Sequence, residues 1–212
     1  MKSFNQYITE KIRLPKDRFE NQHNGFEYVD LDLPSGTLWA TCNIGANKPE
    51  EIGDYFAWGE TEPKKAYNAK TYKLSTDFYK YIKYSEEDNK TVLDNGDDPG
   101  YINMGGRWHL PTSDQIIELM YLHPEYVKNY NDTKMNGVLF TGTNGNKLFI
   151  PAGGYWGAYG HEDVGTWMIL QSNELAPKSI DYTFTYEGRY GSITQSRLFR
   201  TCGTPCRCCF TK

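Results

Sequence analysis

The sequence predicts an α+β fold with a small mixed or antiparallel sheet, one or two helices and long ordered loops. Three aromatic blocks punctuated by glycine occupy residues 33–46, 53–60 and 105–112. Trp and Tyr bury a large apolar area and need a partner for one N–H or O–H group each, and glycine marks sharp turns or close chain approaches. We therefore expect the tryptophan of each block to hold a loop-rich core together.

The clearest helix signal follows Pro111. Residues 112–115 read T-x-x-Q, a capping box in which the threonine and glutamine side chains satisfy free N–H groups at a helix start. The apolar face of this helix is supplied by Ile116, Leu119, Met120 and Leu122. We expect it to end before Pro124, and a second, loosely amphipathic helix over residues 1–20 to break at Pro15.

Short apolar runs between turn residues predict the strands. They are expected at residues 26–33, 37–44, 55–58, 138–141, 147–150, 167–171, 180–187 and 206–210. Residues 142–146 contain an Asn-Gly pair, which is typical of a hairpin turn. Residues 60–100 have little periodicity and are expected to form a long loop anchored by tyrosines.

Composition limits the partners and the location. The 212 residues contain 23 Lys and Arg against 27 Asp and Glu, a net charge of −4. Nucleic-acid binding needs a concentrated basic surface, so no nucleic-acid partner is expected. No apolar stretch is long enough to cross a bilayer, which predicts no membrane insertion. The first thirty residues lack the apolar core of a signal peptide, so export is not expected.

Two groups of side chains contain residue types that can bind metals, and no cofactor is expected. Four cysteines lie in residues 202–209, but structural zinc usually takes pairs from two separated segments, which favours small buried side chains instead. Six carboxylates lie in residues 86–98 and are suited either to calcium or to a solvated acidic loop. The EF-hand spacing is missing, which favours the solvated loop.

The aromatic blocks, taken in order, resemble a known family. Residues 28–46, 53–63, 88–94 and 105–112 look like the Fibrobacter-type major paralogous domains of gut bacteria and their phages. That family is similar to the formylglycine-generating-enzyme branch of C-type lectin folds. The stretch Arg-Trp-His-Leu-Pro-Thr-Ser at residues 107–113 resembles the "RLPT" helix start of that branch. The resemblance implies a C-type lectin-like fold.

Some members of this family are variable proteins of diversity-generating retroelements. In them, adenine-directed mutagenesis rewrites codons of the C-terminal segment, whose surface binds receptors. The resemblance therefore divides the chain into an N-terminal segment, residues 1–20, and a lectin-like ligand-binding domain, residues 21–212, with residues 165–212 as the variable region. Residues 168–170 and the cysteine cluster depart from the usual family pattern, as in a diversified copy.

The N-terminus also resembles a phage sequence. Residues 1–10 are similar to the leaders that target phage head proteins, and residues 8–10 are similar to a prohead-protease cleavage signal. An ordinary amphipathic helix docked on the domain is the alternative. The leader, with the missing export signal, favours a virion protein made in the host cytoplasm.

The resemblance implies a non-catalytic protein that displays its C-terminal segment to host-cell receptors, whether protein or glycan. Tyr and Arg carry much of the energy in binding surfaces. The expected ligand-binding residues are Gln171, Asn173, Tyr182, Tyr186, Arg189, Tyr190, Gln195, Arg197 and Arg200. Other virion subunits are further expected partners, and a homotrimer is consistent with phage fibre proteins.

Two alternatives remain open. One is a formylglycine-generating-type copper oxidase, which needs a reactive cysteine pair. Cys202 and Cys206 are near each other in sequence but do not reproduce the spacing of the family's pair. The other is a purely structural virion subunit.

Overall fold

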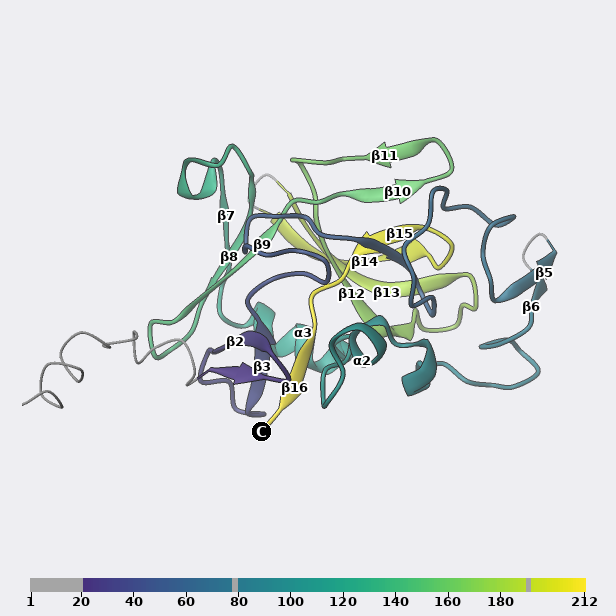
Figure 1. Ribbon diagram of the computed structural model, residues 1–212, viewed down its shortest axis with the longest axis horizontal. Helices are drawn as coiled ribbons and strands as arrows, with labels where there is room; N and C mark the ends of the chain where they lie inside the picture. Colours follow the sequence, from purple (N-terminus) through teal and green to yellow (C-terminus); the bar gives the residue numbers. More distant parts are fainter. Residues whose placement is uncertain (1–20, 78–79, 190–191) are drawn as a thin grey trace, which may run out of the picture.

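The computed structural model of the protein describes residues 21–77, 80–189 and 192–212 (Figure 1). The helix predicted over residues 1–20 lies outside this part of the chain. All the strand pairs in the described part are antiparallel. Two short α-helices accompany them, so the α+β class is confirmed. No helix within the described ranges has both the length and the apolar character needed to cross a bilayer.

The described strands form five sheets. One sheet runs in the order β1 (Gln22–His23), β2 (Phe26–Asp30), β3 (Thr37–Ala40) and β16 (Cys209–Thr211). Another runs β11 (Gly160–Glu162), β10 (Tyr155–Gly157), β15 (Gly203–Pro205) and β4 (Tyr55–Ala57). Two three-stranded sheets contain β12 (Met168–Leu175), β13 (Tyr182–Arg189) and β14 (Ser192–Phe199), and β7 (Glu125–Val127), β8 (Gly137–Thr141) and β9 (Lys147–Pro151). The hairpin of β5 (Ser75–Asp77) and β6 (Lys80–Tyr81) is the fifth.

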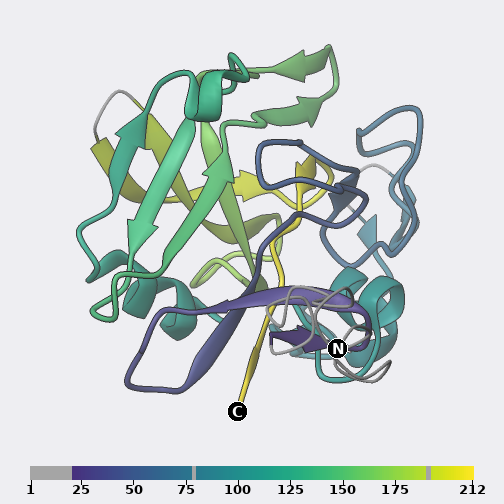
Figure 2. The same cartoon turned by 60° about the vertical axis from the view of Figure 1, so that its left-hand side comes forward.

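The helices are α2 (Pro99–Met104) and α3 (Ser113–Met120), with single 3-10 turns at η2 (Asn95–Asp97) and η3 (Tyr130–Asp132). Helix α3 and strands β8 and β9 cover one face of the β12–β14 sheet (Figure 2). The apolar side chains between them are those of Ile116, Leu119, Val138, Phe140, Leu148, Ile150, Met168, Leu170, Phe184 and Tyr186. We call this cluster the first core, and it packs against one face of β13.

A second core surrounds two of the three block tryptophans. Trp58 and Trp108 lie in it, whereas Trp39 lies in the first core, and all three are fully buried. The Nε1–H of Trp58 donates to the Ser172 carbonyl at 3.1 Å, and that of Trp108 donates to the His23 carbonyl at 2.9 Å. Each of these bonds joins segments distant in sequence. The expected burial of the block tryptophans is confirmed, and the expected indole hydrogen bond is found for Trp58 and Trp108, whereas the Nε1–H of Trp39 has no partner among the described residues.

The predicted strands are found, with shifted ends. The predicted 138–141 and 147–150 hairpin is β8 and β9, and its turn residue Gly145 has φ of +82°, a value that glycine adopts readily. The strand expected at 167–171 runs on to Leu175 as part of β12. Strands β1, β7, β10, β11, β14 and β15 and helix α2 were not predicted, because most are short, polar or glycine-rich runs without a strong period, and β14 is mostly polar.

The loop expected at residues 60–100 is largely irregular but contains β5, β6 and η2. Tyr67, Tyr72, Tyr81 and Tyr84 are buried in it. The prediction that tyrosines anchor this segment is therefore confirmed.

The capping box of α3 is present as predicted. The backbone N–H of Gln115 donates to Thr112 Oγ1 at 3.2 Å, and that of Thr112 donates to Gln115 Oε1 at 2.9 Å. Replacing Thr112 by Ala should lower the free energy of unfolding by about 1 kcal/mol, because the backbone N–H of Gln115 loses its side-chain acceptor. Chemical denaturation would measure it. The exposed Thr194→Ala is the control, and an equal change in both variants would contradict the prediction.

Candidate functional site

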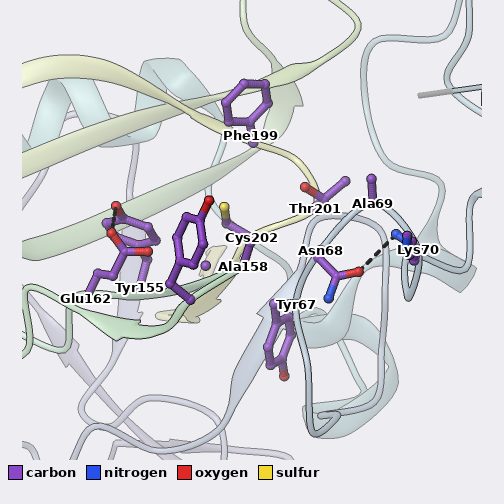
Figure 3. Close-up of a pocket in the computed structure, with 12 residues that line it drawn as sticks. Tyr67, Asn68, Ala69, Lys70, Tyr155, Ala158, Glu162, Phe199, Thr201 and Cys202 are labelled. Atoms are coloured by element: carbon purple, nitrogen blue, oxygen red, sulfur yellow. Dashed lines mark hydrogen bonds between the residues drawn. The ribbon is translucent and has the colours of Figure 1, made fainter. Parts of the chain in front are cut away.

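The main candidate site is a cavity of about 550 Å3 between three segments of the chain. Figure 3 shows Tyr155 and Glu162 on one side, Asn68 and Lys70 on the other, and Cys202 between them. The walls come from the β10–β11 hairpin, the 67–70 loop and residues 199–202 between β14 and β15. The C-terminal segment, where the sequence places the binding function, therefore contributes one wall.

The β10–β11 hairpin presents a tyrosine and a carboxylate to the cavity. Tyr155 and Glu162 are directly opposite in the strand register, and the Tyr155 hydroxyl donates to Glu162 Oε2 at 2.8 Å. Burial, together with this bond to a carboxylate, raises the pKa of Tyr155. A side chain at Gly157 would place its Cβ 2.5 Å from Glu162 Oε1. Glycine at this position therefore leaves room for the pair.

The opposite face of the hairpin fixes it to the body of the protein. The His161 ring stacks on Tyr55, with ring centres 4.9 Å apart, and Trp156 meets Tyr55 edge-on at 6.1 Å. Trp156 also contacts Tyr67, at 5.3 Å. Because strand residues alternate between faces, these packed rings and the Tyr155–Glu162 pair point in opposite directions.

Hydrogen bonds and ring packing hold the 67–70 loop against the rest of the protein. The Tyr67 hydroxyl donates to the Tyr55 carbonyl and accepts from the Lys64 N–H at 3.0 Å. The Tyr67 ring lies against Gly203, where any Cβ would meet it at 2.7 Å. Asn68 Oδ1 accepts from the backbone N–H of Lys70 at 3.0 Å, which closes the turn. This wall is therefore a folded turn with defined contacts.

The third wall consists of Phe199, Thr201 and Cys202. Burial raises the pKa of the Cys202 thiol to about 11, and the nearby charge of Glu162 adds to the increase. The thiol is therefore protonated near neutral pH and contributes a small, weakly polar surface.

Two rows of stacked side chains lead from the β12–β14 sheet to the cavity. In one, the Arg189 guanidinium lies 4.5 Å from the centre of the Trp167 ring, which is 6.4 Å from Tyr155. In the other, Arg197 lies 4.8 Å from the centre of Tyr182, which stacks on Phe199 at 4.4 Å. Three residues predicted for binding, Arg189, Tyr182 and Arg197, are thus connected to the cavity through aromatic rings.

Three other predicted residues are buried and serve the fold, which corrects the expectation that they contact a ligand. Gln171 is buried, donates to Thr183 Oγ1 and accepts from Thr204 Oγ1, both at 3.0 Å. Arg200 is also buried, and its N–H groups bond to main-chain carbonyls and to a tyrosine hydroxyl. Tyr186 packs in the first core. Gln171 pairs with Thr185, the neighbour of Tyr186, so Gln171 and Tyr186 lie on opposite faces of the sheet and both faces are covered there.

Two further predicted residues, Gln195 and Asn173, do not line the cavity. Gln195 is exposed on β14, opposite Tyr186 in the register. Asn173 is half-buried in β12, and its backbone N–H donates to the Pro111 carbonyl at 2.9 Å. Tyr190 lies outside the described residues.

The carboxylates of residues 86–98 have protein partners in several cases. Asp94 pairs with Lys90 at 2.8 Å, and Asp97 pairs with Lys83. Asp98 caps α2, accepting from the Gly100 N–H at 2.7 Å. Across the described residues, no group of three or more His, Cys, Asp or Glu side chains is arranged to hold a metal ion.

The clustered cysteines are buried in separate surroundings. Cys209 packs in the first core and Cys208 in the second, on opposite sides of the chain as expected of neighbouring strand residues. Cys206 also lies in the second core, whereas Cys202 borders the cavity. Burial raises the pKa of all four thiols.

Sequence reasoning missed most of the cavity. The β10–β11 hairpin lines it with Tyr155, Tyr159 and Glu162, and the 67–70 loop adds Asn68. The dense run of aromatic and glycine residues at 153–161 was a usable signal, because such runs mark ordered turns. Nothing in the linear sequence pairs that run with residues 67–70.

Replacing Glu162 by Gln should lower the pKa of Cys202, because removing a nearby negative charge favours the thiolate. At about pH 9, alkylation of Cys202 by iodoacetamide should then become faster, since the thiolate is the reacting form. Mass spectrometry of the Cys202 peptide would give the rate. Glu125→Gln, at an exposed carboxylate that does not influence Cys202, is the control. An unchanged alkylation rate in Glu162→Gln would contradict the placement of the Glu162 carboxylate near the Cys202 thiol.

Comparison with known proteins does not assign the chain to a family. No protein-family model, curated protein or solved structure matches it.

Proposed function

We propose that this chain is a non-catalytic binding protein whose ligand site is the cavity bordered by Phe199, Thr201 and Cys202. The supporting observation is the combination of that cavity with the two arginine–aromatic rows that run to it from the β12–β14 sheet. Rings and guanidinium groups supply large contact areas and directional bonds, the usual composition of binding hot spots.

The exposed aromatic residues at the cavity support this proposal. Tyr159 at the hairpin tip is 98% exposed, and Phe199 on the opposite wall is 38% exposed. A partner that covers a large ring removes a large apolar area from water, which favours binding. Because the ring has few rotatable bonds, little conformational entropy is lost. A rigid scaffold beneath them lowers the cost of binding further.

The setting of this activity comes from the resemblance of the sequence. We propose a C-type lectin-like fold in a phage virion protein that binds a host-cell receptor, with residues 165–212 as the diversified region. Other virion subunits are the second class of partner, and the chain itself forms a homotrimer. In the copper-oxidase alternative, Cys202 and Cys206 would form the reactive pair, but only Cys202 borders the cavity. This separation favours binding over oxidase chemistry.

Replacing Tyr159 or Phe199 by Ala should weaken attachment of the purified chain to host cells about tenfold or more, since aromatic hot spots contribute about 2 kcal/mol or more each. Flow cytometry with labelled protein would measure the attachment. Tyr121→Ala is the matched control, because Tyr121 is 74% exposed but does not line the cavity. Equal attachment of all three variants would rule out the cavity as the receptor site.

The fold also predicts which positions vary among sibling copies of the gene. Differences should concentrate at exposed positions of β14 such as Thr194, Gln195 and Arg197, because their side chains do not pack in a core. Arg200 and Arg207 should stay constant, because both are buried and hydrogen-bonded. Sequencing the siblings tests this, and differences spread evenly over the chain would contradict diversification.

A further inference from the structure

Among the described residues that line the cavity, one is acidic, Glu162, and one is basic, Lys70, and the two stand on opposite sides (Figure 3). Glu162 is the only carboxylate that the described part of the chain contributes to the lining. Its Oε2 accepts from Tyr155, and no ion pair within the described residues includes Glu162. A half-buried carboxylate without a counter-ion loses hydration that a single hydroxyl restores only in part. A bound cation would supply the missing charge.

The rest of the lining favours an organic cation over a metal ion or a sugar. Tyr67, Tyr155, Tyr159 and Phe199 contribute rings, and Gly157 and Ala158 add apolar surface. Ring faces attract ammonium groups, whereas hard metal ions need several oxygen ligands. A sugar needs many hydrogen-bond partners, but Asn68 Oδ1 is already used within its own turn.

The β10–β11 hairpin holds the Glu162 carboxylate in a fixed position at the cavity, where a cation can pair with it. Tyr155 and Glu162 are opposite each other on adjacent strands, and the packed Trp156 and His161 rings fix the hairpin from behind. Gly157 leaves the space beside Oε1 open to the cavity, since any side chain there would meet that oxygen. Lys70 stands on the far wall (Figure 3) and is exposed, so water hydrates its charge.

We propose that the cavity binds an alkylammonium group, held by the Glu162 carboxylate against the Tyr155, Tyr159 and Phe199 rings. This rests on the proposed function and names the chemistry that the same site recognises. The group can come from a choline headgroup or from a lysine side chain of a partner protein, since both present an ammonium at the end of an alkyl chain.

Titration of the full chain with choline chloride, Nα-acetyl-lysine methylamide and 3,3-dimethylbutan-1-ol tests the proposal. The alcohol has nearly the shape of choline without the charge. By calorimetry or amide chemical shifts, at least one ammonium compound should bind about tenfold or more tightly than the alcohol, because the ion pair and the ring contacts both need the charge. Tight binding of choline alone identifies a headgroup, and binding of the lysine compound identifies a protein side chain.

The Glu162→Gln variant should lose about tenfold or more of the ammonium affinity, while Glu125→Gln keeps it. If neither ammonium compound binds the unaltered chain more tightly than the alcohol does, the proposal is overturned without any variant. If Tyr159→Ala loses cell attachment but no ammonium binds, the receptor function stands and the ammonium class is wrong. If an ammonium binds but Tyr159→Ala attaches normally, the receptor function fails instead.

Discussion

The guanidinium group of Arg200 attaches the residues on either side of the β5–β6 hairpin to the end of β14 and to Ile180. Its Nε donates to the Tyr72 hydroxyl at 2.8 Å, and its Nη1 and Nη2 donate to the carbonyls of Tyr84, Ile180 and Lys83 at 2.9, 3.2 and 3.1 Å. The rings of Trp58 and Tyr81 lie 5.0 and 4.2 Å from it. A fully buried cation is costly unless its donors are satisfied. Here carbonyl dipoles and ring faces replace water, so the surrounding loops must keep their positions.

This arrangement explains how a long irregular segment can support a cavity. Residues 60–98 contain few strand residues, yet the Arg200 bonds attach them to the end of β14. Three wall residues are sequence neighbours of Arg200: Phe199, Thr201 and Cys202. Because the hydrogen bonds of Arg200 fix the backbone there, they also fix the positions of these neighbours. Arg207 acts in the same way near β3: its Nε donates to Asn43 Oδ1 at 2.7 Å and its Nη1 to the Ala40 carbonyl at 2.9 Å. Burial lowers the pKa of Arg207 to about 10.

The proposed activity uses the contrast between rigid and exposed parts of the C-terminal segment. Inward positions of β12, β13 and β14 fill the cores, and outward positions such as Arg189 and Arg197 form the rows that reach the cavity. A binding surface built in this way can change its outward side chains with little effect on packing, since surface substitutions usually change stability by less than about 0.5 kcal/mol.

The sequence alone determined the features that depend on local physics. The α3 capping box, the Asn-Gly hairpin and the burial of the three block tryptophans follow from residue types at short spacing. The resemblance of the sequence also predicted that the C-terminal segment carries the binding surface. Three of the residues predicted there contact the cavity lining through aromatic rings: Tyr182, Arg189 and Arg197. Only the tertiary structure decided that Gln171, Tyr186 and Arg200 face inward and that Glu162 meets the 67–70 loop across a cavity. The physical reason for the first is that alternation along a strand does not say which face of the sheet other elements cover. The reason for the second is that the segments around the cavity are held together by contacts between residues about a hundred positions apart, such as Tyr55 with Gly153.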